Sequence, residues 1–96
     1  MAKSRSQPSG KPQQKALPLL DLHGFSVEDV PDAVDRFLIQ AQRKGAERVR
    51  IMPGKGSGKV RAAVAQYLKL GGFPFENEKL PGGTVNEGVL VVFLGD

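Results

Sequence analysis

Apolar residues recur along this chain with two different periods. Over residues 19–23 and again over 47–52, apolar and polar positions alternate, which is the pattern of a strand with one buried face. The two stretches that follow have apolar residues spaced by three and four, which is typical of amphipathic helices. The first predicted helix uses Val30, Ala33, Val34, Phe37, Leu38 and Ala41. The second uses Val60, Ala63, Val64, Tyr67 and Leu68.

Capping and breaking residues limit these helices. Ser26 or Asp29 can cap the first helix, and Pro31 favours the later start because proline is tolerated only in the first turn. Gly45 is placed to end that helix in a left-handed cap, and Gly71-Gly72 stops the second helix.

The C-terminal third predicts two more strands. Residues 73–79 form the first of them, with Pro74 indicating an edge strand or a late start. Residues 80–88 predict a loop or hairpin turn, and the apolar run over 89–94 predicts a central strand. The expected fold is α/β: a two-layer βαβαββ sandwich with a mixed four-stranded sheet.

Charge separates a tail from a folded body. Residues 1–16 hold four of the fourteen basic residues and no acid, and their composition predicts a disordered basic tail before a domain over 17–96. The ten remaining basic residues balance all ten acids. The tail is either an arm attracted to phosphate backbones or a solvated leader. No cysteine is present, and no apolar run approaches the roughly 20 residues of a membrane span, so we expect a cytoplasmic monomer with no membrane contact.

Two short motifs carry the candidate chemistry: Leu-Asp-Leu-His-Gly at 20–24 and Gly-Lys-Gly-Ser-Gly at 54–58. Each follows a predicted strand and precedes a predicted helix. Because loops at the carboxyl ends of neighbouring parallel strands meet on one edge of a sheet, we expect the two motifs to converge.

The second motif predicts a phosphate site. Its glycines allow close approach of the backbone, and the helix that follows offers free amides to an anion. Cationic side chains can neutralise phosphate. The candidate phosphate-binding residues are Gly24, Gly54, Lys55, Gly56, Gly58, Lys59 and Arg61. The alternative is a flexible turn without a ligand. An ATP-binding P-loop is not supported. Three residues rather than four separate Gly54 from Gly58-Lys59, and Val60 stands where a magnesium-binding hydroxyl is needed, so we expect no nucleotide triphosphate.

Asp21 and His23 lie two apart on a predicted strand, so their side chains share a face. A carboxylate can orient an imidazole that acts as general acid or base in phosphodiester cleavage. The same pair could hold a divalent cation such as Mg²⁺ or Mn²⁺, or could only satisfy loop amides. Phe25, in the loop after this motif, is the best candidate for stacking on a base.

Together these motifs resemble the small MutS-related (Smr) domain family, over residues 19–94. The resemblance implies a βαβαββ fold similar to the C-terminal domain of a bacterial translation initiation factor. It also implies DNA or RNA binding, with nicking or cleavage in several members. By position it makes Asp21 and His23 the catalytic candidates, with Arg61 as the basic residue of the second helix. The family's glycine loop usually begins with histidine, whereas this chain has Pro53.

The leading hypothesis is therefore a nucleic-acid-binding domain with endonuclease activity, of the short stand-alone type or an excised domain. Pro53 removes a second histidine, so cleavage that uses two histidines is unavailable. Two alternatives stay open: a non-catalytic RNA- or DNA-binding module associated with the ribosome, and an adaptor that binds an acidic protein partner.

Overall fold

The computed structural model describes residues 17–54 and 58–95. The predicted tail over 1–16 and the site candidates Lys55 and Gly56 lie outside these residues. In chain order the elements are β1 (Leu19–Asp21), the short 3-10 helix η2 (Val27–Asp29), α1 (Val30–Arg43), β2 (Arg48–Met52), α2 (Lys59–Gly71), β3 (Phe75–Lys79) and β4 (Val85–Phe93).

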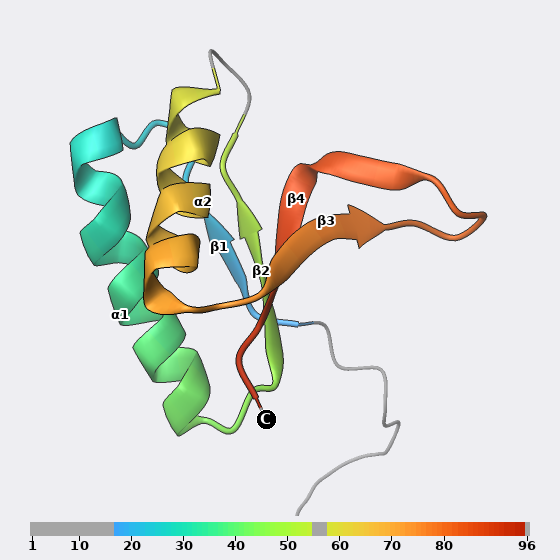
Figure 1. Cartoon of the computed structure of the whole chain (residues 1–96), viewed down its shortest axis with the longest axis horizontal. Helices are drawn as coiled ribbons and strands as arrows, with labels where there is room; N and C mark the ends of the chain where they lie inside the picture. Colours follow the sequence, from blue (N-terminus) through green and yellow to red (C-terminus); the bar gives the residue numbers. More distant parts are fainter. Residues whose placement is uncertain (1–16, 55–57, 96) are drawn as a thin grey trace, which may run out of the picture.

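The four strands form one mixed sheet in the order β1-β2-β4-β3. β1 and β2 are parallel, with Leu20 opposite Ile51, and the other two pairings are antiparallel. Figure 1 shows α1 and α2 side by side on one face of the sheet, while the β3–β4 hairpin extends away from them. The predicted two-layer βαβαββ fold is confirmed, with β4 as a central strand.

The core lies between the helices and the sheet. Each contributing strand or helix presents the residues that its apolar period predicted. The fully buried side chains are Leu22, Val30, Val34, Leu38, Val49, Ile51, Val64, Leu68, Leu90 and Val92, all at most 2% exposed. Within the described part of the chain, no helix is long and apolar enough to cross a membrane.

The first helix begins in two steps. Ser26 precedes η2, its hydroxyl donates to Asp29 Oδ2 at 3.0 Å, and α1 then starts at Val30 with Pro31 in its first turn. The later start is thus confirmed. Gly45, with a φ of +82°, follows the last turn, as a left-handed helix end requires.

Two predicted strand boundaries were wrong, those of β1 and β4. β1 ends at Asp21 rather than His23, because the chain turns after Leu22. For β3 the late start indicated by Pro74 is confirmed: the strand begins at Phe75 and lies at the edge of the sheet, since Pro74 cannot donate to the ladder. β4 begins at Val85, so the predicted loop over 80–88 shrinks to a tight turn in which the Leu80 amide donates to the Thr84 carbonyl at 2.8 Å.

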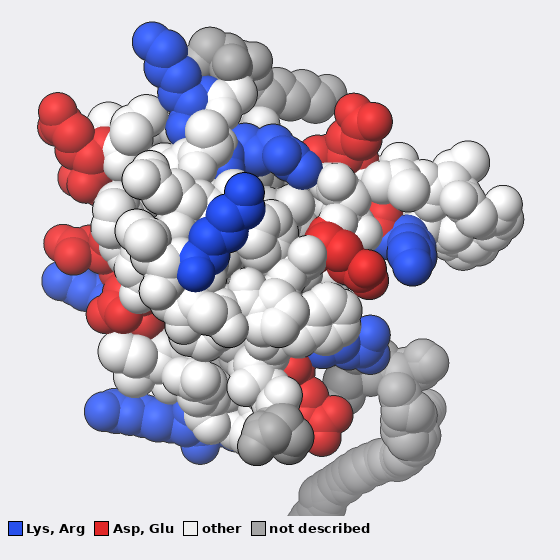
Figure 2. Space-filling model, in the orientation of Figure 1, with Lys and Arg blue, Asp and Glu red and all other residues white. Residues whose placement is uncertain are grey.

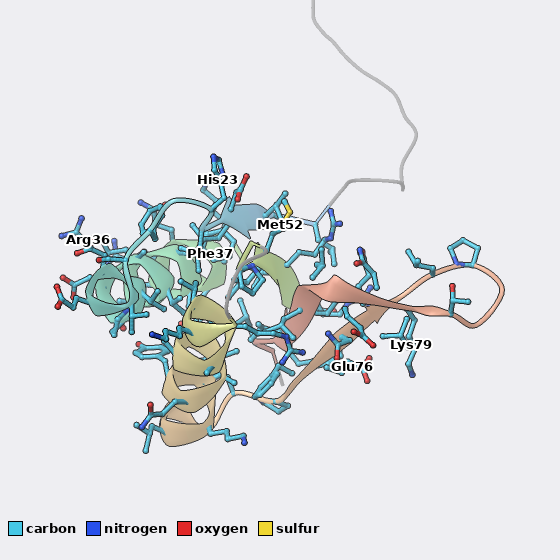
Figure 3. All side chains as sticks on the ribbon, turned by 90° about the horizontal axis from the view of Figure 1, so that it is seen from above. His23, Arg36, Phe37, Met52, Glu76 and Lys79 are labelled. Atoms are coloured by element: carbon cyan, nitrogen blue, oxygen red, sulfur yellow. The ribbon has the colours of Figure 1, made fainter. Side chains whose placement is uncertain are left out.

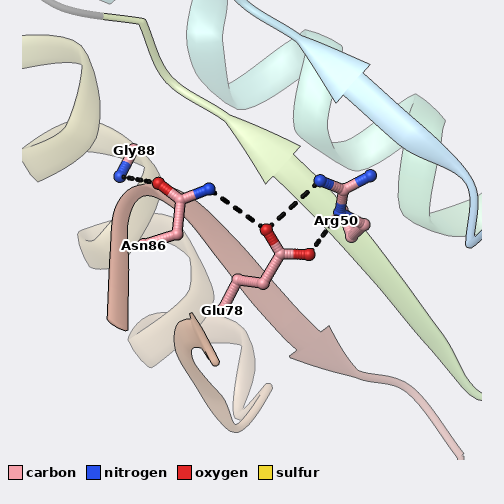
Figure 4. A network of polar contacts seen from close by, with 4 residues as sticks. All are labelled: Arg50, Glu78, Asn86 and Gly88. Atoms are coloured by element: carbon pink, nitrogen blue, oxygen red, sulfur yellow. Dashed lines mark hydrogen bonds and ion pairs between the residues drawn. The ribbon is translucent and has the colours of Figure 1, made fainter. Parts of the chain in front are cut away.

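A polar network explains why β4 extends through Gly88. The β3–β4 register shifts between Asn77 and Glu78, and Glu78 pairs with Asn86 across the hairpin. Glu78 accepts hydrogen bonds from Arg50 Nη2 on β2, at 3.2 Å, and from Asn86, at 3.2 Å, and its other carboxylate oxygen forms an ion pair with Arg50 Nε at 3.0 Å (Figure 4). The Gly88 amide donates to Asn86 Oδ1 at 3.0 Å. Side chains far apart in sequence therefore hold the irregular part of the hairpin, which a local pattern does not reveal.

Candidate nucleic-acid interface

The turn after β1 is closed by the backbone. The Leu22 amide still donates to the Met52 carbonyl of β2 at 2.9 Å. The Phe25 amide donates to the Leu22 carbonyl at 3.0 Å and closes the turn. Gly24 occupies the third position of this turn with a φ of +81°, the value that a type II turn requires there. The turn thus fixes His23 and Phe25 on either side of a glycine.

Asp21 and His23 form a local pair in this turn. Asp21 Oδ1 accepts from the His23 backbone amide at 3.0 Å and lies 3.0 Å from His23 Nδ1. The side chains are 44% and 82% exposed, respectively. Figure 3, which views the molecule from above, shows the His23 side chain pointing outward from the ribbon. The pair is therefore open to a large substrate, and the one loop amide that Asp21 satisfies, that of His23, is itself exposed.

The hydrogen bonds determine which imidazole nitrogen is available. The backbone amide of His23, and then its side chain, donate to the Asp21 carboxylate and lower the pKa of that group below its ordinary value of 3.8. At neutral pH the carboxylate is ionised and only accepts, so Nδ1 must carry the hydrogen in their hydrogen bond. In the neutral ring, Nε2 then has a lone pair that can take a proton.

The glycine loop after β2 reaches this turn. Gly54 has a φ of +95°, and a Cβ atom placed on it would lie 3.3 Å from the His23 Cα and 3.5 Å from its Cβ. The first of these distances is tighter than most real contacts of a Cβ atom. Two reasons therefore favour glycine at position 54: its backbone conformation and its close approach to His23. The predicted convergence of the two motifs is observed.

A hollow of about 210 Å³ lies between the two loops and the start of α2. Its walls are Phe25, Ser26, Val27, Pro53, Gly54, Gly58, Lys59, Val60 and Arg61. Asp21 and His23 are not part of this lining; they lie beside it, next to Gly54. The sequence thus predicted one composite site, and the structure has two adjoining parts, an exposed imidazole and a cation-lined hollow.

The hollow suits an anion. Gly58 precedes α2 with a φ of +87°, no described side chain caps this helix, and its first turn holds no acidic residue. Helix amides and dipole therefore favour negative charge here. Lys59 and Arg61 add cationic side chains, and basic side chains lie at the end of the molecule where α2 begins (Figure 2).

Asn77 is a residue that sequence reasoning missed. The Arg61 guanidinium donates to Asn77 Oδ1 on β3 at 3.2 Å, which fixes the guanidinium at the wall of the hollow. This contact depends on how the start of α2 packs over β3 in the folded chain, so no spacing in the sequence indicates it. Pro53, the residue before the glycine loop, is buried in the same wall.

Only a small set of side chains near the hollow could ligate a divalent cation. Among the described residues, no group of three His, Cys, Asp or Glu side chains gathers in one place. Asp21 and His23 are therefore the candidate protein ligands for a divalent ion at this site. Oδ1 of Asp21 already accepts two hydrogen bonds from His23. A cation at this position would need further ligands from a substrate or from water.

The fold and both motifs define the class of this protein. The model of the Smr domain family matches residues 20–95, and the chain belongs to that family. The Smr domain of Thermus thermophilus MutS2 superimposes with a TM-score of 0.70 at 30% identity, covering 80% of this chain and 96% of that one. YdaL, a stand-alone small MutS-related protein from Escherichia coli, gives a TM-score of 0.61 at 30% identity and covers 81% and 64% of the two chains.

Sequence relatives are much longer proteins. Endonuclease MutS2 of Symbiobacterium thermophilum is 44% identical over 52 residues, which are 54% of this chain and 7% of that protein. Endonuclease MutS2 of Listeria monocytogenes serotype 4a is 41% identical over 61 residues, 64% of this chain and again 7% of the relative. The similarity thus concerns only a small part of each of these relatives.

Proposed function

We propose that this Smr domain binds nucleic acid and cleaves its phosphodiester bonds as an endonuclease. The observation that carries the proposal is the contact of Gly54 with the Asp21–His23 turn, which sets an oriented imidazole beside an anion-attracting hollow. Similarity to proteins named endonuclease MutS2 supports it. The cytoplasmic location and monomeric state expected from the sequence belong to the same proposal.

His23 acts as the general base. Its Nε2 accepts a proton from a water molecule, whose oxygen forms the new bond to phosphorus while the bond from phosphorus to the leaving oxygen breaks. Asp21 holds the ring in the required tautomer and stabilises the imidazolium. The leaving oxygen takes its proton from solvent, because the chain has one histidine only.

The hollow holds the neighbouring phosphate. Since Asp21 and His23 do not line it, we assign the scissile phosphate to the exposed imidazole and the adjacent phosphate of the same strand to the hollow. There, Lys59, Arg61 and the first amides of α2 bind the phosphate oxygens. Binding at the hollow thereby positions the scissile bond.

A divalent cation is compatible with this arrangement. The Asp21 carboxylate would hold Mg²⁺ or Mn²⁺ through Oδ2, together with phosphate oxygens of the substrate, which leaves Nε2 of His23 available as the base. The ion would supply stabilisation of the charge that develops on the phosphate.

A non-catalytic nucleic-acid-binding module is the second candidate. The observation that favours it is Pro53, a buried residue that cannot take or give a proton at the place where the family usually has histidine. Binding is less affected by this replacement, because the glycine φ values, Lys59 and Arg61 remain.

Labelled single-stranded RNA, single-stranded DNA and branched DNA separate the candidates. Each is incubated with the protein in Mg²⁺, Mn²⁺ or chelator, and binding and products are measured together. Products from any substrate support the endonuclease. Salt-sensitive binding without products under every condition supports the binding module. No binding at low salt contradicts both and favours an adaptor for a protein partner.

A further inference from the structure

Phe25 differs from every other aromatic residue of the chain. Phe37, Tyr67, Phe73 and Phe75 pack against the core, and Phe93 is half-buried at the end of β4. Phe25 is 39% exposed and lies outside the core cluster. Its ring therefore contributes little to the interior, and its surroundings decide what else it can do.

Those surroundings are the anion-attracting hollow. Phe25 lines the wall with Val27 and Val60, while Lys59 and Arg61 line it with cationic groups. One cavity thus offers both an apolar aromatic surface and positive charge. A nucleotide has the matching parts, a flat ring with a π-face and a phosphate.

The backbone also fixes Phe25 relative to the catalytic candidate. The Phe25 amide donates to Leu22 at 3.0 Å and closes the turn that carries His23 two residues earlier. A base stacked on Phe25 would therefore belong to a nucleotide close to the phosphodiester bond at which His23 acts as the base.

We propose that Phe25 is a stacking platform for an unpaired base, which makes single-stranded or locally unpaired nucleic acid the substrate class of this site. The proposal rests on the proposed function and adds the form of its substrate. In a duplex the faces of each base are covered by its neighbours, so only an unpaired or extruded base can offer a free face to the ring. Because stacking does not read hydrogen-bonding edges, DNA and RNA strands both fit.

The test uses tryptophan fluorescence. The chain has no tryptophan, so Phe25→Trp introduces a single reporter that keeps a stacking ring. It is titrated with an octamer as DNA and as RNA, and with a DNA octamer of abasic sites that keeps every phosphate. Val85→Trp is the matched control, because Val85 is 50% exposed on the β3–β4 hairpin, which extends away from the helices (Figure 1).

Stacking predicts that base-containing octamers quench the indole emission of the Phe25→Trp variant and that the abasic octamer does not. The abasic octamer should also bind at least about fivefold more weakly. The emission of the Val85→Trp variant should not change with any octamer. Phe25→Leu, which keeps apolar bulk, should weaken single-strand binding by a similar factor and leave duplex binding unchanged.

Two results separate the failures. Equal binding of base-containing and abasic octamers, with unchanged emission of the Phe25→Trp variant, would overturn the stacking platform and leave phosphate binding intact. No binding of any octamer would overturn the proposed function and the stacking platform together. A larger effect with either DNA or RNA would support the platform and identify which strand the site prefers.

Discussion

Gly54 lies directly against His23, so that a Cβ atom at position 54 would be 3.3 Å from the Cα atom of the histidine. This contact joins the two motifs and brings a general-base candidate beside the anion-binding hollow. Every part of the proposed mechanism depends on it, because the imidazole itself is 82% exposed and its position is set by the backbone of its turn.

We predict that Gly54→Ala destabilises the fold by about 1–3 kcal/mol and lowers cleavage. The alanine is strained at a φ of +95° and its methyl group also presses against the His23 backbone. Gly82→Ala is the matched control: Gly82 has a φ of +92°, but nothing lies within 4 Å of a Cβ there. Urea unfolding and cleavage rates of both variants separate strain from contact. Equal behaviour of the two would show that the contact with His23 is unimportant.

Asp21→Asn should slow cleavage strongly and change binding little. The asparagine side chain can donate to Nδ1 and favour the wrong imidazole tautomer, as at other carboxylate–histidine pairs. Single-turnover rates and dissociation constants, measured on the same substrate, test this. An unchanged rate would mean that Asp21 does not orient the base.

The same substitution has a pH signature. Because hydrogen bonds from His23 lower the pKa of Asp21 in the folded state, this carboxylate stabilises the fold at pH values above its ordinary pKa of 3.8. That contribution is lost as the pH falls below 3.8 through the lowered value. The difference in unfolding free energy between wild type and Asp21→Asn should therefore be constant near neutrality and shrink in acid. Urea unfolding of both proteins across the acid range measures it, and a difference that stays constant in acid would contradict the assignment.

Tyr67 and Asp35 provide a test at the other end of the pH scale. The Tyr67 hydroxyl donates to Asp35 Oδ1 at 2.6 Å between the two helices, and this hydrogen bond raises the pKa of Tyr67 to about 12. The folded state thus holds the phenol proton more tightly. We predict that Tyr67→Phe costs about 1 kcal/mol below pH 10 and that this difference disappears between pH 10 and 12. Unfolding by urea at about pH 9 and about pH 11.5 measures it; a constant difference would contradict the assignment.

Arg61→Ala should weaken binding to all nucleic-acid sequences and flatten the salt dependence by about one counterion. The reason is that Arg61 lies at the hollow, held there by Asn77. Arg43→Ala serves as the control. It removes the same charge from the C-terminal end of α1, and Arg43 does not line the hollow. Dissociation constants at several salt concentrations compare them. Equal effects of the two would indicate general charge attraction rather than a site in the hollow.

Much of this fold could be predicted because its signals are local. The periods of the apolar residues located both helices and β2, and Pro31, Gly45 and Gly72 marked helix ends. The convergence of Asp21–His23 with Gly54 followed from parallel strand topology alone. These features depend on neighbouring residues and on one general rule of sheets.

The parts that were missed depend on distant side chains. The Arg50–Glu78–Asn86 network extends β4 back to Val85, against a glycine-rich pattern that predicts a loop. Likewise, the bond from Arg61 to Asn77 requires β3 beside α2. The separation of the hollow from the imidazole was also missed, because residue spacing does not indicate which side chains line a cavity.

The central claim is that His23 is the base of an endonuclease. Its most direct test is a cleavage assay on labelled single-stranded RNA, single-stranded DNA and branched DNA, with wild type and His23→Ala side by side and each in Mg²⁺, Mn²⁺ or chelator. We predict that the products disappear in the variant while its dissociation constant stays within about twofold, since His23 does not line the hollow. Equal cleavage by His23→Ala would contradict the claim.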